Sequence, residues 1–290
     1  MAKSILAKTG TGEIQLTITI ATDEVKKSYE QALEEIVKET EIPGFRKGKA
    51  PKKLVEEKID KSKVYEKVLQ RLVPKVYIEA VKEHNLKPIL TPKVELLKAK
   101  EGEDWEIRAT TCETPEVHLG RYKEEIRKAL APTKIWVPHK KPATTETRNS
   151  QEGTEDEKTQ KVIQKLLEIV KVDLPEMLME DEVKRALSNL INQTNTLGLT
   201  IDQYLNSINK SAEQLRAEYR ERIVNDLKLQ FSLDKVAEEE KIQVSDKEID
   251  DLISSTGDKN LKENLNTPLQ RAYLKGILLR RRSLEFLTKL

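Results

Sequence analysis

The sequence contains little of what a disulfide-stabilised or membrane-spanning protein requires. Cysteine occurs once, at Cys112, which excludes an internal disulfide and favours a reducing compartment. No apolar run is long enough to cross a membrane, and the first residues lack the apolar stretch of a signal peptide. We therefore expect a cytoplasmic protein.

Side chains that carry chemistry are also scarce. His84, His118 and His139 are isolated from one another in the sequence, and none lies near a cysteine or clustered carboxylates at metal-ligand spacing, so they do not predict a metal site. Cys112 lies in a predicted strand, where a small buried side chain is expected rather than a nucleophile. Lys8–Glu13 (KTGTGE) lacks the Gly-Lys-Ser/Thr ending of a phosphate loop, and a hairpin turn explains it better. The sequence predicts no cofactor, no metal and no catalytic residue.

Aromatic residues make up only 4% of the chain, whereas charged residues make up 35% with a formal net charge of +2. Because the two signs nearly balance, the composition does not indicate a global field for nucleic acid. Aliphatic side chains must supply most of the core. This favours helices packed by aliphatic stripes around a thin interior.

The first zone of the chain, residues 1–117, mixes strand and helix patterns. Apolar and polar residues alternate over 14–20, as in a half-buried strand, and again over 93–99 and 104–112. The Glu101-Gly102 pair joins the last two runs as a hairpin. Strands, then helices, then strands predict an α+β domain, in which helices cover one side of an antiparallel sheet.

Two longer helices and a short one are expected between these strands. Thr22 is expected to cap the first helix, whose inward residues recur at helical spacing. Pro51 suits the first turn of a short helix that carries Leu54. The second long helix has inward residues from Val64 to Val81, and Pro74 is expected to kink or divide it.

Residues 118–157 are expected to form a connector followed by a polar linker. From Ala131 onward this segment has three prolines and few apolar residues, so it cannot bury enough surface to fold by itself. Trp136 is the exception. It is expected either to dock on a neighbouring domain or to contact a ligand.

Residues 158–290 predict an extended all-α domain. Ser211 with Gln214, and Ser245 with Glu248, have the capping-box spacing, and the helix that starts at Ser211 spans roughly 45 Å. Long helices with thin apolar stripes suggest an open bundle with apolar surface left for partners. The alternative, in which every stripe is ordinary core, remains open at this stage.

The most unusual segment is residues 41–54, EIPGFRKGKAPKKL. Phe45 stands between Gly44 and Gly48, and no acidic residue occurs from 44 to 53. The same stretch carries five cations: Arg46, Lys47, Lys49, Lys52 and Lys53. A basic surface loop, a phenylalanine folded back into the core and a non-specific nucleic-acid patch are three possible interpretations.

A docking loop explains the order of these residues better. The flanking glycines allow a tight excursion that leaves the ring uncovered. An aromatic ring beside an arginine is a pair that dominates small interfaces, and nearby lysines attract a partner with phosphates or carboxylates. The loop therefore predicts binding to a negatively charged site with an apolar notch.

Residues 42–51 (IPGFRKGKAP) closely resemble the ribosome-docking signature of the trigger factor family, bacterial chaperones that meet nascent chains at the exit tunnel. Further segments are similar to later parts of the family: 114–123, 173–183, 197–207 and 239–253. The resemblance implies a ribosomal protein at the tunnel rim and nearby ribosomal RNA as partners. It assigns the docking contacts to Phe45, Arg46 and Lys47, with Gly44 and Gly48 shaping the loop and Lys49 supporting it.

The resemblance also implies an activity, with one departure. The family usually has a peptidyl-prolyl isomerase domain of about a hundred residues, a size that residues 131–157 cannot provide. We therefore expect an ATP-independent chaperone that shields nascent chains during folding and export and is not an enzyme. An isomerase, a general RNA-binding protein and a secreted chaperone are the alternatives. Whether the free protein forms a weak homodimer stays open.

Overall fold

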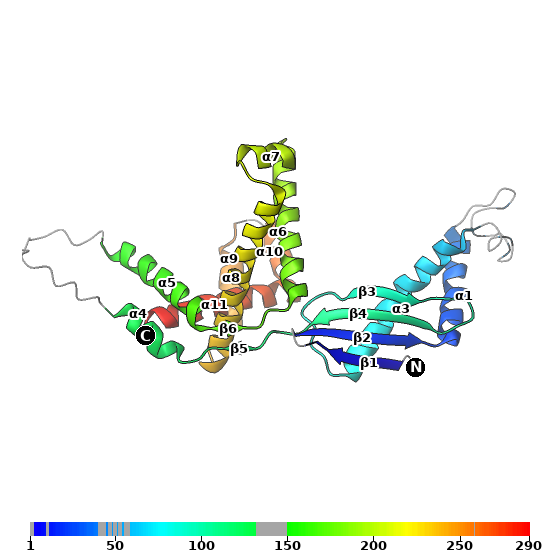
Figure 1. The fold of residues 1–290 in the computed structure, drawn as a ribbon, viewed down its shortest axis with the longest axis horizontal. Helices are drawn as coiled ribbons and strands as arrows, with labels where there is room; N and C mark the ends of the chain where they lie inside the picture. Colours follow the sequence, from blue (N-terminus) through cyan, green and yellow to red (C-terminus); the bar gives the residue numbers. More distant parts are fainter. Residues whose placement is uncertain are drawn as a thin grey trace, which may run out of the picture. The chain divides into compact units, whose positions relative to one another are not determined.

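The computed structural model describes residues 3–9, 12–39, 59–131, 150–257 and 259–290, together with Phe45, Gly48, Pro51 and Leu54. These residues form two compact units (Figure 1). Unit 1 comprises Met1–Thr114 and Pro175–Leu178, and unit 2 comprises Pro115–Leu174 and Met179–Leu290.

Unit 1 is an antiparallel sheet covered on one face by two helices (Figure 1). The strands lie in the order β1 (Lys3–Lys8), β2 (Glu13–Ile20), β4 (Trp105–Cys112) and β3 (Lys93–Lys98). The helices are α1 (Thr22–Glu39) and α3 (Lys61–Glu83), which pack against each other. This arrangement confirms the predicted α+β fold.

The core of unit 1 follows directly from the alternation in β2 and β4. Every second residue of β2 is buried against the helices, and the polar residues between them face the other side of the sheet. Cys112 at the end of β4 is buried, as expected. The buried β2 residues are Ile14, Leu16, Ile18 and Ile20, and they meet Val25, Leu33, Val64, Val68, Leu72 and Val76 of the helices.

One local expectation for unit 1 is wrong, and of the two outcomes expected at Pro74, a kink or a division of the helix, the division is absent. Thr22 does not cap α1 with its own side chain: its N–H and its hydroxyl both donate to Asp104 Oδ1, at 2.8 and 2.7 Å. These two hydrogen bonds hold the pKa of the Asp104 carboxyl below its ordinary value. Pro74 does not divide α3. Proline has no N–H, so Pro74 leaves the Gln70 carbonyl without its usual helical donor. Both residues are exposed, so water can replace the missing hydrogen bond.

Unit 2 is built from helices and one small pair of strands. β5 (Val117–His118) pairs antiparallel with β6 (Lys171–Val172), so the region after residue 158 is not entirely helical. The helices are α4 (Tyr122–Leu130), α5 (Ser150–Ile169), α6 (Glu176–Thr196, whose first residues belong to unit 1), α7 (Ile201–Ser207), α8 (Ala212–Glu239), α9 (Asp246–Ser255), α10 (Lys259–Leu265) and α11 (Pro268–Thr288). The capping boxes at Ser211 and Ser245 are present as predicted.

The connector expected over 118–157 contains more regular structure than its composition suggests. Tyr122 and Ile126 of α4, four residues apart, are buried, and α5 begins at Ser150. Tyr122 and Ile126 pack in one core with residues of α5, α8 and α11, which include Val162, Leu166, Val236 and Leu287. Trp136 lies outside the described residues.

A polar cluster fastens the start of α4 to the end of α8. The Tyr122 hydroxyl donates to Glu240 Oε1 at 2.8 Å, and Lys123 Nζ lies 2.6 Å from the same oxygen. Burial, reinforced by the neighbouring carboxylate, raises the pKa of Tyr122. The hydrogen bonds from Lys123 and Tyr122 lower the pKa of Glu240, so its contribution to stability is lost as the pH falls through that lowered value.

The three consecutive arginines of α11 do more than form a solvated face. Arg280 lies 3.3 Å from Asp234 of α8, and Arg282 donates to the Gln243 carbonyl and to Glu248. Both side chains therefore hold α11 to its neighbours. Within the described ranges, no helix is both long and apolar enough to cross a membrane.

Replacing Ile18 tests whether the buried face of β2 is the main support of unit 1. Ile18 is 0% exposed, so Ile18→Ala is expected to lower the free energy of unfolding by about 2–5 kcal/mol. Ile5→Ala on β1, where the side chain is 67% exposed, should cost less than about 0.5 kcal/mol. Urea unfolding followed by circular dichroism measures both, and equal losses would contradict the assignment of the core.

Candidate functional site

In the chain, the basic segment lies between the two helices that cover the sheet of unit 1. It follows α1, which ends at Glu39, and precedes α3, which begins at Lys61. Phe45 is 41% exposed, so the interpretation in which this ring folds back into the core is wrong. The other predicted contacts, Arg46, Lys47, Gly44 and Lys49, lie outside the described residues.

Gly48 is fixed as glycine by two independent constraints. Its φ of +76° belongs to the left-handed region, which side chains with a Cβ rarely adopt. A Cβ atom on Gly48 would also lie 3.0 Å from the carbonyl oxygen of Lys38 and 3.4 Å from its Cα. The loop therefore returns at Gly48 to touch the backbone of the last turn of α1.

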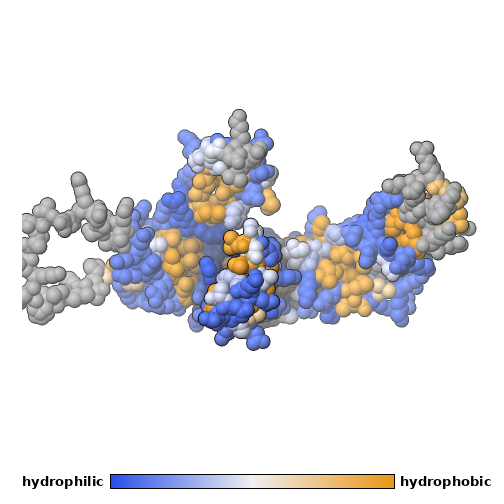
Figure 2. All heavy atoms as spheres, turned by 90° about the horizontal axis from the view of Figure 1, so that it is seen from above, coloured by the Kyte–Doolittle hydropathy of each residue, from blue (hydrophilic) through white to orange (hydrophobic). Residues whose placement is uncertain are grey.

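A second candidate surface is apolar and lies in unit 2. The row expected along α8 is largely buried: Leu215, Ile223, Leu227 and Phe231 are core residues. Exposed apolar side chains come instead from other helices, and Figure 2 shows apolar patches that interrupt the polar surface. We name two groups: the α11 stripe (Leu269, Tyr273 and Ile277) and the α6 tip (Ile191, Leu197 and Leu199).

The α11 stripe runs along one side of a helix whose other side is packed. Leu269, Tyr273 and Ile277 are 79%, 61% and 40% exposed, whereas Leu274 and Leu278 pack against a small core that includes residues of α9. The α6 tip is exposed by 41%, 76% and 42%. Sequence analysis predicted leftover apolar surface but did not name these residues.

A signal for the α11 stripe was present in the sequence. Apolar residues recur every fourth position in two separate rows, so the helix has more apolar surface than one packed face can bury. Two rows do not by themselves reveal which row is covered. That choice depends on where α9 and α10 pack, which is a tertiary property.

Titratable side chains in the described ranges have structural partners where they are perturbed. In the ranges that the structure describes, no three His, Cys, Asp or Glu side chains are grouped to hold a metal ion. Shifted pKa values have structural causes. The pKa of Asp60 is lowered because it accepts hydrogen bonds from Ser62 at the start of α3, and burial raises the pKa of Asp234 although Arg280 opposes this.

Comparison with protein-family models divides the chain at nearly the same place as its composition does. Residues 1–134 match the model described as bacterial trigger factor protein, and residues 144–289 match that of the trigger factor C-terminus. Residues 135–143 separate the two matches.

Curated relatives named trigger factor align with part of this chain. That of Natranaerobius thermophilus is 38% identical over 111 residues, or 38% of this chain and 25% of the relative. That of Moorella thermoacetica is 38% identical over 120 residues, or 41% of this chain and 27% of the relative. The aligned part thus spans about a quarter of these curated relatives.

A solved structure shares the fold over the whole length. It belongs to work on promiscuous substrate recognition in the folding and assembly activities of the trigger factor chaperone, and it aligns over 99% of both chains. The TM-score is 0.68 and the sequence identity is 17%, so this likeness bears on the fold. Because the C-terminal model alone covers half of the chain and the N-terminal model covers nearly all of the rest, this chain belongs to the bacterial trigger factor family.

Proposed function

We propose that this protein is an ATP-independent chaperone that docks on the ribosome at the polypeptide exit tunnel and shields nascent chains during folding and export. The observation that carries the proposal is the exposed Phe45 in a glycine-bounded cationic loop of the family's N-terminal domain. A ribosomal partner would place its action in the cytoplasm.

The docking site would consist of Phe45, Arg46 and Lys47, with Gly44 and Gly48 shaping the loop and Lys49 adding charge. A ring and a guanidinium that become buried at a small interface can each contribute roughly 2–4 kcal/mol. Such a contact is specific and still reversible, because little other surface is buried with it. The lysines would speed the encounter with an acidic rim of protein and RNA.

Clients would bind to the α11 stripe and the α6 tip. Contacts of this kind are non-directional, because burial of apolar area favours any side chain that covers it. Individual contacts are weak, so a client that folds and buries its own apolar residues is released without nucleotide hydrolysis. Broad client choice follows from the same property.

Isomerase activity is not part of the proposal. Only residues 135–143 lie between the two family matches, far fewer than the roughly 50 residues of even a small domain. A prolyl site also requires an aromatic-lined pocket, and Trp136 is the one aromatic residue between 131 and 157.

Alanine substitution of the loop tests ribosome docking. Phe45→Ala, Arg46→Ala and Lys47→Ala combined should reduce ribosome co-sedimentation by at least about 30-fold, which corresponds to the loss of about 2 kcal/mol. Far-UV circular dichroism should stay unchanged, because Phe45 is exposed and the other two side chains are charged.

A matched control for this test exists on α3. Lys75, Ile78 and Lys82 are all exposed, so their combined replacement by alanine removes the same kinds of side chain from another part of unit 1. Equal losses of ribosome binding in both triple variants would contradict the docking site. Equal affinity for free RNA and for intact ribosomes would instead support a general RNA-binding protein.

Polar substitution of the α11 stripe tests client binding. Leu269→Gln, Tyr273→Gln and Ile277→Gln keep good helix formers while removing apolar surface. The concentration that half-suppresses aggregation of an unfolded reporter protein should rise at least about fivefold, if about 1 kcal/mol of client contact is lost. The control variant carries Ile5→Gln, Ile78→Gln and Leu97→Gln in unit 1, and the proposed client surface is refuted if both variants suppress aggregation equally well.

Prolyl isomerisation of a short peptide should proceed at its uncatalysed rate in the presence of the protein. The time constant is then tens of seconds at 25 °C, the same as without protein. A known prolyl isomerase, assayed in parallel, shows that the assay responds. Acceleration that grows with the concentration of this protein would overturn the exclusion.

A further inference from the structure

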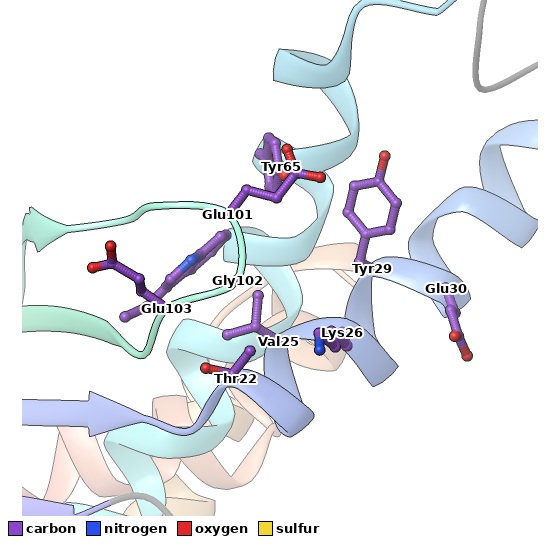
Figure 3. A pocket seen from close by; sticks show the side chains of 10 residues that line it. Thr22, Val25, Lys26, Tyr29, Glu30, Tyr65, Glu101, Gly102 and Glu103 are labelled. Atoms are coloured by element: carbon purple, nitrogen blue, oxygen red, sulfur yellow. The ribbon is translucent and has the colours of Figure 1, made fainter.

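Unit 1 contains a pocket of about 230 Å³ beside the first turns of α1. Figure 3 shows its residues coming from α1, from the start of α3 and from the β3–β4 turn at Glu101–Glu103. The docking loop and the client surfaces described above contribute no residue to it. A molecule bound in this pocket would therefore occupy a site distinct from the docking loop and from the client surfaces.

Aromatic rings form much of the pocket lining. Tyr29 and Tyr65 are half-buried with ring centroids 5.4 Å apart, and the Tyr65 ring lies 5.6 Å from that of Trp105. Trp105 is 2% exposed, and Val25 is 7% exposed. The indole Nε1–H already donates to the Lys100 carbonyl at 3.3 Å, so the indole can offer an occupant only the apolar surface of its ring.

The volume limits what can enter. Pockets for drug-sized ligands and cofactors measure roughly 300–1,000 Å³, so about 230 Å³ is too small for them. One large side chain is a better match in size. An isolated charge would lose its hydration against Val25 and Trp105, so the side chain that enters is apolar.

Three carboxylates are among the lining residues, and Figure 3 shows the Glu30 side chain turned away from the Tyr29 and Tyr65 rings. Glu30, Glu101 and Glu103 are exposed, and Lys26 is the single cation among the lining residues. Glu101 lies 3.4 Å from Lys61, and Glu103 lies 2.8 Å from Lys98. Glu30 makes no ion pair within the described part of the chain, so its negative charge is available to a partner.

We propose that this pocket binds unfolded polypeptide through one large apolar side chain that stands next to a lysine or arginine. The apolar side chain would contact Tyr29, Tyr65, Val25 and Trp105, and the neighbouring cation would meet Glu30 at the mouth. The inference rests on the proposed chaperone function for the class of ligand. It adds a client contact to the same unit that carries the docking loop.

The fluorescence of Trp105 provides a direct test in the full-length protein. The chain has two tryptophans, so Trp136→Phe leaves Trp105 as the sole indole. Three peptides are titrated to millimolar concentration: Gly-Ser-Phe-Arg-Ser-Gly, Gly-Ser-Phe-Glu-Ser-Gly and Gly-Ser-Ala-Arg-Ser-Gly. We expect a saturable change in emission with the first peptide, binding about threefold weaker with the second, and no saturation with the third.

Charge reversal at the mouth separates recognition from mere stability. Glu30→Lys should weaken the Phe-Arg peptide about threefold and strengthen the Phe-Glu peptide by a similar factor, a reversal that misfolding cannot produce. Glu79→Lys is the matched control: Glu79 is an exposed carboxylate on α3 outside the pocket and should leave both affinities unchanged. Tyr29→Ala should abolish saturation while thermal unfolding still shows a folded unit.

Either of two results would overturn the pocket assignment: no saturable response to the Phe-Arg peptide, or a preference that Glu30→Lys does not change. The loop variant lacking Phe45, Arg46 and Lys47 should keep the peptide response in full. Loss of ribosome binding in that variant therefore bears on docking alone. Failure of the peptide titration while ribosome binding persists defeats only the pocket.

Discussion

Burial of one face of the β2–β4 sheet by α1 and α3 is the interaction on which the rest of unit 1 depends. The aliphatic row of β2 fixes both helices, α1 before the basic segment in the chain and α3 after it. A loop with so many cations gains little from packing on its own domain. Phe45 within this segment is 41% exposed, so its ring remains available to a partner.

The proposed docking loop and the proposed client surfaces of unit 2 rest on different kinds of chemistry. Docking is assigned to a compact set of charged and aromatic residues, where geometry selects one partner. Client binding is assigned to scattered apolar side chains such as Leu269 and Leu197, where no geometry is imposed. Separate surfaces allow the affinity for the ribosome and the affinity for clients to change independently.

Local periodicity made most of the fold predictable, and its failures have physical causes. The β2 alternation and the capping boxes at Ser211 and Ser245 depend on neighbouring residues alone, so sequence was enough. The capping of Thr22 by Asp104 joins residues 82 positions apart, which no local pattern encodes. In the candidate site, glycine spacing and charge predicted an uncovered Phe45. The sequence could not show which of the two apolar rows of α11 is exposed, because this depends on how α9 and α10 pack against that helix.

The close approach of Gly48 to Lys38 has a consequence for the reach of the loop. Phe45 is three residues from that contact, and three extended residues span at most about 11 Å. Phe45 is thus tethered within that distance of the Gly48 contact with the last turn of α1. A short tether costs less entropy on association than a long one, so a small contact area can still give useful affinity. The position of Gly48 thereby affects how tightly the small contact at Phe45 can bind a partner.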